Sequence, residues 1–364
     1  MIDRETLYSL YIKLKNEDKV TETITGDLNR SLTAEQYFDE KSNTYHKAYA
    51  NGLSFHNIYD DDGNIIGDEN NSYTYNELGE LISTSGLVNA SYQYDSRGNI
   101  TSKTVDGNTA TYAYDNEWKD QLTAVNGIPL TYDANGNLVS YGDSTYTWSH
   151  GKQLESVTNE KGTYNYTYDE NGIRLTKPGY TFDTFNGRVL AQHGANNIYF
   201  QYNVDKPIGF ILNQNQYYYL TNPSGDIVGI TDSKCDLIAT YTYDEWGKLL
   251  EITADNDDNR QIAETNPLRY RGYYYDNETG YYYLQSRYYD PDLGRFISAD
   301  DFRYINSYNP LNLNAYAYCA NNPLIYSDPK GTYVSDVGVA VAEILSAIFV
   351  CIDIFERDLG DSTK

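Results

Sequence analysis

The side chains in this sequence that could most readily bind a metal or take part in a reaction are aspartates that recur in one short pattern. An aromatic residue precedes an aspartate, two variable residues and a glycine at 59–63, 94–98, 132–136, 168–172 and 243–247. Carboxylates at this spacing suggest a calcium loop, above all at Asp60-Asp61-Asp62-Gly63-Asn64, but the spaced oxygen ligands and closing glutamate of an EF-hand are missing. Aspartate also accepts hydrogen bonds from the backbone two residues on, and glycine tolerates a positive φ. We therefore interpret the pattern as a turn.

Other reactive side chains are scattered. The histidines occur in unrelated contexts without metal-ligand spacing, at His46, His56, His150 and His193. The cysteines form no C-x-x-C pair that would indicate a disulfide framework or a zinc site, at Cys235, Cys319 and Cys351. No glycine-rich phosphate loop is present. The sequence predicts no metal and no cofactor.

The composition predicts strands and argues against a nucleic-acid partner. The 364 residues include 41 tyrosines, and aromatic residues favour half-buried strands. The net charge of −25 opposes binding to nucleic acid or to an anionic membrane. The first residues lack the basic and apolar regions of a secretory signal, so we expect secretion or surface association to depend on signals outside this chain.

The aromatic anchors of the pattern indicate a repeat of one β-hairpin. Including looser copies, the anchors stand at 59, 75, 94, 114, 132, 148 and 168, which are 16 to 20 residues apart. Tyrosines alternate before the turn, as in Tyr164, Tyr166 and Tyr168, so they share one face of a strand. We expect them to pack across strands, with stacking on sugars as the alternative.

This unit resembles the YD repeats of the Rhs, teneurin and insecticidal toxin-complex families, from about residue 58 to 331. The resemblance implies an all-β fold in which a strip of antiparallel β-hairpins spirals into a shell. Residues 1–57 show no clear repeat, and 58–216 carry the YD hairpins. With so few repeats, we expect a partial shell rather than an enclosed cavity.

Residues 217–331 are similar to the Rhs repeat-associated core domain. The motifs that carry the similarity are Arg-Tyr-Arg-Gly at 269–272, Arg-Tyr-Tyr-Asp-Pro at 287–291, Gly-Arg-Phe at 294–296 and Asp-Pro-Lys-Gly at 328–331. In many relatives this domain ends at an Asp-Pro-x-Gly signature, where self-cleavage by two aspartates and an arginine releases a toxin.

By motif, the resemblance implies a catalytic set of Arg287, Asp300 and Asp328, with cleavage around Gly331, Thr332 and Tyr333. Two close carboxylates share a proton, so one can polarise a carbonyl while the other activates water, and the arginine can hold one acid ionised. The alternative is that all three residues are structural, since aspartate before proline is common in turns. Aspartyl self-cleavage is therefore an open expectation, and no other activity is predicted.

Three positions depart from the family pattern. Asp301 stands where proline is usual, the loop at 303–314 is longer, and Thr332 replaces a commoner apolar residue. A shift of one residue would let Asp301 substitute for Asp300.

The tail at 332–364 is too short for a typical toxin enzyme. Polar residues between Asp336 and Arg357 fall on one helical stripe, which predicts an amphipathic C-terminal helix that docks on the sheet, with membrane insertion as the alternative.

These features predict an Rhs-type shell fragment that encloses or presents a C-terminal toxin tail and releases it by self-cleavage. Its expected partners are that tail in cis and an upstream Rhs shell or secretion apparatus. The alternative function is a cell-surface adhesion or carbohydrate-binding protein that uses tyrosine faces to bind glycans.

Overall fold

The computed structural model describes residues 19–25, 31–39, 41–203, 206–301, 314–332 and 335–336. Its strands pair antiparallel and almost entirely in sequence order, in sheets of sixteen, ten, four and two strands. The repeat of one hairpin per unit is thereby confirmed.

The sixteen-stranded sheet runs from the N-terminal side of the chain. Its strands are β1 (Lys19–Thr25), β2 (Ser31–Asp39), β3 (Thr44–Tyr49), β4 (Ser54–Tyr59), β5 (Ile65–Gly67), β6 (Ser72–Tyr75), β7 (Leu81–Ser85), β8 (Ala90–Tyr94), β9 (Ile100–Val105), β10 (Asn108–Tyr114), β11 (Leu122–Val125), β12 (Ile128–Tyr132), β13 (Leu138–Tyr141), β14 (Ser144–Ser149), β15 (Gln153–Asn159) and β16 (Gly162–Asn165). Strands β1 to β3 lie before residue 58, where the sequence showed no clear repeat, yet they pair in the same order.

The ten-stranded sheet continues the strip. Its strands are β17 (Thr167–Tyr168), β18 (Arg174–Lys177), β19 (Tyr180–Phe185), β20 (Arg188–Gly194), β21 (Ile198–Asn203), β22 (Lys206–Leu212), β23 (Asn215–Thr221), β24 (Ile227–Thr231), β25 (Leu237–Tyr243) and β26 (Leu249–Ala254). The smaller sheets comprise β27 (Tyr274–Asp276), β28 (Tyr281–Tyr283), β29 (Tyr288–Asp290) and β30 (Arg295–Phe296), and then β31 (Tyr326–Ser327) with β32 (Ser335–Asp336).

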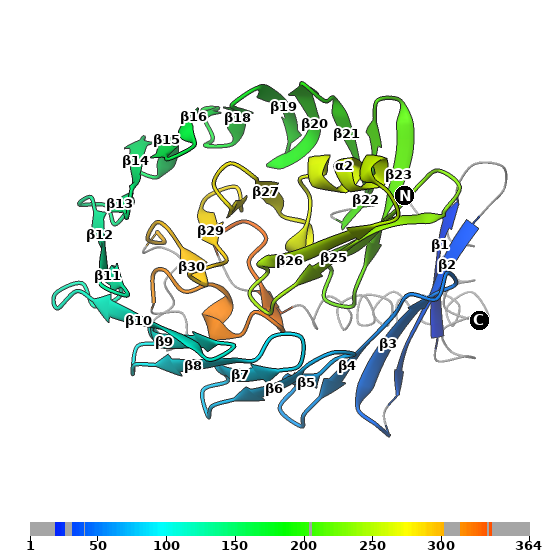
Figure 1. Cartoon of the computed structure of the whole chain (residues 1–364), viewed down its shortest axis with the longest axis horizontal. Helices are drawn as coiled ribbons and strands as arrows, with labels where there is room; N and C mark the ends of the chain where they lie inside the picture. Colours follow the sequence, from blue (N-terminus) through cyan, green and yellow to red (C-terminus); the bar gives the residue numbers. More distant parts are fainter. Residues whose placement is uncertain are drawn as a thin grey trace, which may run out of the picture.

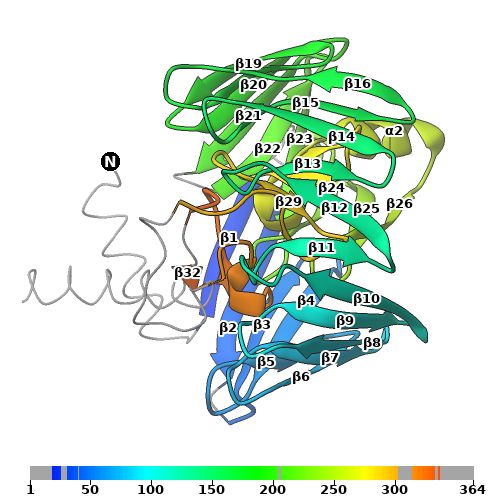
Figure 2. The ribbon, with the colours of Figure 1, turned by 90° about the vertical axis from the view of Figure 1, so that its left-hand side faces the viewer.

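The strip bends into a ring around the four-stranded sheet (Figure 1). From the side, β7 to β15 lie one beside the next along its wall (Figure 2). The first strands of the strip meet its later part at β23, because the Tyr49 hydroxyl in β3 accepts a hydrogen bond from the Thr221 amide at 2.9 Å and donates one to the Thr221 carbonyl at 3.0 Å. Lys47 Nζ contacts the Thr221 hydroxyl at 3.0 Å. The repeats therefore close one turn despite their small number.

The aspartates of the repeat make the turns that the sequence predicted. Asp95 Oδ1 accepts hydrogen bonds from the amides of Arg97 and Asn99, at 2.8 and 3.1 Å. Gly98 takes the positive φ of 75° that this turn requires. The same pair of bonds forms in the other strict copies, at Asp60, Asp133, Asp169 and Asp244. The turn interpretation is confirmed.

Many aromatic anchors of the repeat link their hairpin to the preceding one. The Tyr94 hydroxyl donates to the Leu81 carbonyl at 2.6 Å, and the Tyr168 hydroxyl donates to the Leu154 carbonyl at 2.8 Å. Equivalent bonds to an earlier hairpin are made by Tyr75, Tyr114, Trp148, Tyr202 and Tyr243. The period of the sequence is therefore also a period of hydrogen bonding between units.

Where a tyrosine stands two residues before an anchor of the strip, it points into the ring and packs there. Tyr92, Tyr146 and Tyr166 are buried. The Tyr92 ring lies 5.6 Å from that of Trp246, and the Tyr146 hydroxyl is 2.7 Å from that of Tyr281. Because these rings belong to the hydrophobic core shared by the strip and the four-stranded sheet, their observed role is packing.

The part of the chain that follows the strip, residues 255–331, is called the core segment here, and it is also attached to the turns of the strip. Side chains from this segment donate to the glycine carbonyls of successive turns, in the pairs Asn322 to Gly79, Asn321 to Gly98, Tyr316 to Gly136 and Tyr282 to Gly247, at 2.7 to 2.9 Å. The interior of the ring is thus a packed core, and hydrogen bonds to the turns of the strip attach it to the surrounding strands.

A helix within the core segment differs from expectation. We predicted a helix only in the tail, but α2 (Asp257–Thr265) follows the last strand of the strip. Asn256 caps it by accepting from the Asn259 amide at 2.9 Å, and two aspartates occupy its first turn. The prediction that helix occurs only in the tail is therefore wrong. Asp336, the first polar residue of the predicted tail helix, lies in β32, and the rest of that helix falls outside the described residues.

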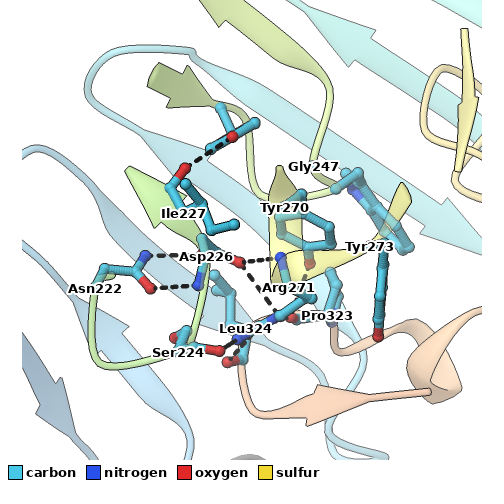
Figure 3. Close-up of polar contacts among 12 residues, drawn as sticks. Asn222, Ser224, Asp226, Ile227, Gly247, Tyr270, Arg271, Tyr273, Pro323 and Leu324 are labelled. Atoms are coloured by element: carbon cyan, nitrogen blue, oxygen red, sulfur yellow. Dashed lines mark hydrogen bonds and ion pairs between the residues drawn. The ribbon is translucent and has the colours of Figure 1, made fainter. Parts of the chain in front are cut away.

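Arg271 anchors the loop that leads to the C-terminal signature (Figure 3). Its amide donates to Asp226 Oδ1 at 3.0 Å, and its guanidinium donates to the carbonyls of Ser224, Pro323 and Leu324. The Tyr270 hydroxyl also donates to the Pro323 carbonyl, at 3.2 Å. This loop therefore has a fixed path toward the last described strands.

No helix among the described residues is long and apolar enough to cross a membrane.

Candidate active site

Arg287 lies at the centre of the residues that the motifs singled out. It directly precedes β29, is 4% exposed, and places its guanidinium carbon 3.6 Å from the centroid of the Phe296 ring. Its Nη2 atom is 2.9 Å from Asp300 Oδ2 and 3.1 Å from Asp328 Oδ2. Burial lowers the pKa of Arg287, while the two carboxylates oppose that change. The structure thus brings all three predicted residues together.

Asp300 follows β30 and is the less buried of the two acids. Its amide donates to the Ala315 carbonyl at 2.8 Å, and its Oδ1 accepts the Asp301 amide at 2.7 Å. Burial raises the pKa of Asp300 to about 6, against the opposing effect of the Arg287 charge. This carboxyl can therefore exchange a proton near neutral pH. Asp300 makes the predicted carboxylate contact with Arg287.

Asp328 follows β31 and is 1% exposed. Its amide donates to the Tyr273 hydroxyl at 3.1 Å. Its Oδ1 accepts a hydrogen bond from the Thr332 amide at 2.9 Å, which closes the turn of the signature. The second acid therefore contacts the nitrogen of the peptide bond that joins Gly331 to Thr332.

The carbonyl of the same peptide bond is held from the other side. The Gly331 oxygen accepts from Arg287 Nε at 2.5 Å and from Ser286 Oγ at 2.6 Å. Gly331 has a φ of 68°, and a Cβ atom there would lie 2.9 Å from both the Leu284 carbonyl oxygen and Ser286 Oγ. Glycine is therefore required for this approach.

These contacts place polar groups at both the carbonyl oxygen and the nitrogen of the Gly331–Thr332 peptide bond. Two donors face the carbonyl oxygen, and one carboxyl faces the nitrogen. The other carboxyl lies on the same guanidinium, with a pKa suited to proton transfer. The arrangement can support hydrolysis of the Gly331–Thr332 bond. It differs from the expectation that a protonated carboxyl polarises the carbonyl, since Arg287 and Ser286 occupy that place.

Sequence reasoning missed three residues at this site. Ser286 was overlooked although it directly precedes Arg287, and Tyr273 and Lys152 come from distant segments. Lys152 Nζ donates to the Ala299 carbonyl at 2.5 Å, beside Asp300. No local pattern could have identified the last two, because Lys152 lies 147 residues before Ala299 and Tyr273 lies 55 residues before Asp328. Tyr333, the remaining predicted residue, lies outside the described residues.

In the described part of the chain, no cluster of three or more histidine, cysteine, aspartate or glutamate side chains is arranged to hold a metal ion. The turn aspartates instead accept backbone amides.

Comparison with known proteins decides the family. Residues 56–324 match the Teneurin YD-shell family. The chain belongs to this family. It is an Rhs/YD-repeat protein, as its motifs indicated.

Curated relatives of this YD-shell protein include two from Bacillus. It is 35% identical over 278 residues to the tRNA3(Ser)-specific nuclease WapA of Bacillus spizizenii, which covers 71% of this chain and 12% of that protein. It is 35% identical over 283 residues to the tRNA nuclease WapA of Bacillus subtilis, with the same coverage of 71% and 12%. The YD-shell chain therefore spans about an eighth of the length of these relatives.

A solved structure supports the fold of the YD-shell chain. The crystal structure of TcdB2-TccC3-Cdc42 is similar with a TM-score of 0.67 and 18% identity, over 85% of this chain and 19% of that one. At this identity the similarity establishes the fold alone.

Proposed function

We propose that this YD-shell chain is a self-processing unit that holds its C-terminal segment and cuts the chain after Gly331. The observation that carries the proposal is the clamped peptide bond, with Arg287 Nε on the Gly331 oxygen and Asp328 Oδ1 on the Thr332 nitrogen. A turn that served only structure would not need a buried arginine joined to two acids beside one glycine carbonyl.

The proposed reaction is hydrolysis by a pair of acids that share one proton. Asp300, in its ionised form, accepts a proton from a water molecule as the water oxygen attacks the Gly331 carbonyl carbon. Asp328, in its protonated form, gives its proton to the Thr332 nitrogen as the carbon–nitrogen bond breaks. The first products are a carboxylic acid on Gly331 and an amine on Thr332. The acid then gives its proton to the amine, which leaves a carboxylate and an ammonium, and solvent exchange returns the proton from Asp300 to Asp328.

The role of Arg287 in this reaction is electrostatic. Its Nη2 atom contacts both acids, so the positive charge favours the single negative charge that the pair carries. Its Nε atom faces the oxygen on which negative charge develops. The buried Arg287 guanidinium therefore contacts the proposed base Asp300, the proposed acid Asp328 and the Gly331 carbonyl oxygen.

The role of the released segment is inferred from the relatives. The WapA proteins are named as tRNA nucleases, and this chain matches only part of each. We place this chain in a toxin-delivery system that acts outside the producing cell, with residues 332–364 as the segment that the shell presents. The partner is thus the C-terminal segment in cis, together with any further shell to which the chain is joined.

The test is the mass of the full chain after synthesis. Wild type should give fragments 1–331 and 332–364, whereas Asp328→Asn and Asp300→Asn should leave a single uncut mass, because each removes a carboxyl and keeps its shape. Asp301→Asn is the matched control and should cut like wild type. A wild-type chain that stays uncut over days between pH 5 and 8 would show that the site is only structural. If Asp301→Asn stops cutting and Asp300→Asn does not, then Asp301 is the base in place of Asp300.

A further inference from the structure

Ser286 occupies the bend between β28 and β29, next to the last described turn. Its amide donates to the Leu284 carbonyl at 2.7 Å and to the Lys330 carbonyl at 3.2 Å. The backbone of Ser286 therefore already fixes the segment before Gly331. Its hydroxyl is not needed to hold that segment in place.

The hydroxyl of Ser286 has two acceptors for one hydrogen. Oγ lies 2.7 Å from the Lys330 oxygen and 2.6 Å from the Gly331 oxygen. A hydroxyl donates a single hydrogen bond, so the two carbonyls compete for it in the uncut chain. Both carbonyls are neutral amides at this stage, and neither has a clear advantage.

Attack of water on the Gly331 carbon removes this balance. The Gly331 oxygen then gains negative charge, whereas the Lys330 carbonyl does not change. Hydrogen bonds to a charged oxygen are about twice as strong as those to a neutral one, so the hydroxyl turns to Gly331. An interaction that strengthens only as the reaction proceeds accelerates the reaction.

We infer that Ser286 is a catalytic residue of this site, as the second donor of an oxyanion hole completed by Arg287 Nε. This inference rests on the self-cleavage proposed above and names a residue outside the aspartate pair and the arginine. Both donors lie within hydrogen-bonding distance of the oxygen that becomes charged, which is the geometric requirement for such a hole.

Ser286 is assigned as a donor and not as a nucleophile. A nucleophilic serine needs a base to take its proton. The contacts that the structure records for Ser286 Oγ are the two carbonyl oxygens, which accept hydrogen bonds but cannot take up the proton. The residue is also exposed, whereas Arg287 is buried, so solvent can partly replace its hydroxyl.

The experiment measures the cleavage rate of three variants of the full chain from the moment of cell-free synthesis, by intact mass. Ser286→Ala should slow cleavage by roughly 10- to 100-fold, below the full effect of a buried oxyanion donor because of the exposure. Ser286→Thr keeps a hydroxyl and should restore most of the rate. Ser83→Ala is the control, since it removes a hydroxyl contact of 2.6 Å to Thr74 in the strip and should change nothing.

Each outcome decides one question. If wild type does not cut, self-cleavage itself fails. If wild type cuts and Ser286→Ala cuts within twofold of its rate, the oxyanion role is wrong while self-cleavage stands. If Ser286→Ala is completely inactive and wild type accumulates an ester on Ser286, the residue is a nucleophile and the inference is also wrong.

The pH midpoint of the rate should be the same in Ser286→Ala as in wild type, because a donor hydroxyl does not titrate there. A shifted midpoint would contradict the inference and indicate displaced acids.

Discussion

Replacing Gly331 by alanine tests whether the peptide bond must lie where the structure places it. The new Cβ atom would approach the Leu284 carbonyl oxygen to 2.9 Å and the Arg287 amide nitrogen to 3.1 Å. The first contact is closer than real Cβ atoms tolerate, and its partner is backbone that cannot rotate away. The backbone at residue 331 or at Leu284 must therefore shift, and we expect this shift to disturb the contact of the residue 331 carbonyl with Arg287 Nε.

Two costs follow from this substitution and can be separated. An alanine at a φ of 68° costs about 1 to 2 kcal/mol of stability wherever it occurs. Displacement of a reacting carbonyl slows a reaction by up to about 100-fold for a shift near 1 Å, so we expect Gly331→Ala to cut at least roughly 10-fold more slowly. Gly107→Ala is the matched control, because Gly107 has a φ of 82° and no atom within 4 Å of its Cβ position.

The assay combines intact mass over time with thermal unfolding of both variants. Gly107→Ala should lose stability but cut at the rate of wild type, and Gly331→Ala should lose stability and cutting. Cutting of Gly331→Ala at the wild-type rate would refute the requirement for glycine. Equal slowing in Gly107→Ala would show that stability, and not position, controls the rate.

Three further predictions concern the acids, the arginine and the repeat. Because the base must be ionised and the pKa of Asp300 is raised to about 6, the cleavage rate should rise with pH through about 6 and be roughly 10-fold lower at pH 5 than on its plateau, and a flat profile from pH 5 to 8 would contradict this. Arg287→Lys keeps the charge but cannot reach both acids and the Gly331 oxygen together, so cutting should fall by at least about 10-fold in the mass assay. Tyr94→Phe removes the bond to the Leu81 carbonyl and should lower the free energy of unfolding in urea by about 1 kcal/mol, whereas a loss below 0.3 kcal/mol would argue against the link between units.

The sequence predicted the features that depend on neighbouring residues. The turn at 95–99 needs only an aspartate, its next few amides and a glycine, so its chemistry is visible in the pattern itself. The alternation of Tyr92 and Tyr94 likewise gave the face that packs inward. The acids and Arg287 followed from motif similarity, and the structure brings them together.

The features that the sequence did not predict depend on contacts between distant segments. Lys152 reaches Ala299 only because the strip returns around the core segment. Closure through Tyr49 and Thr221 joins residues far apart in the chain and leaves no local pattern. The role of Ser286 was missed for a different reason, since a serine beside an arginine is common and only the position of the Gly331 oxygen gives it a function.

The most direct test of the central claim is the concentration dependence of cutting in the purified full chain. Self-cleavage after Gly331 within one molecule predicts a first-order rate that does not change over a 100-fold dilution. It also predicts a small fragment whose first residue is Thr332. A rate that rises with protein concentration, a cut at another bond, or a chain that remains whole would contradict the account.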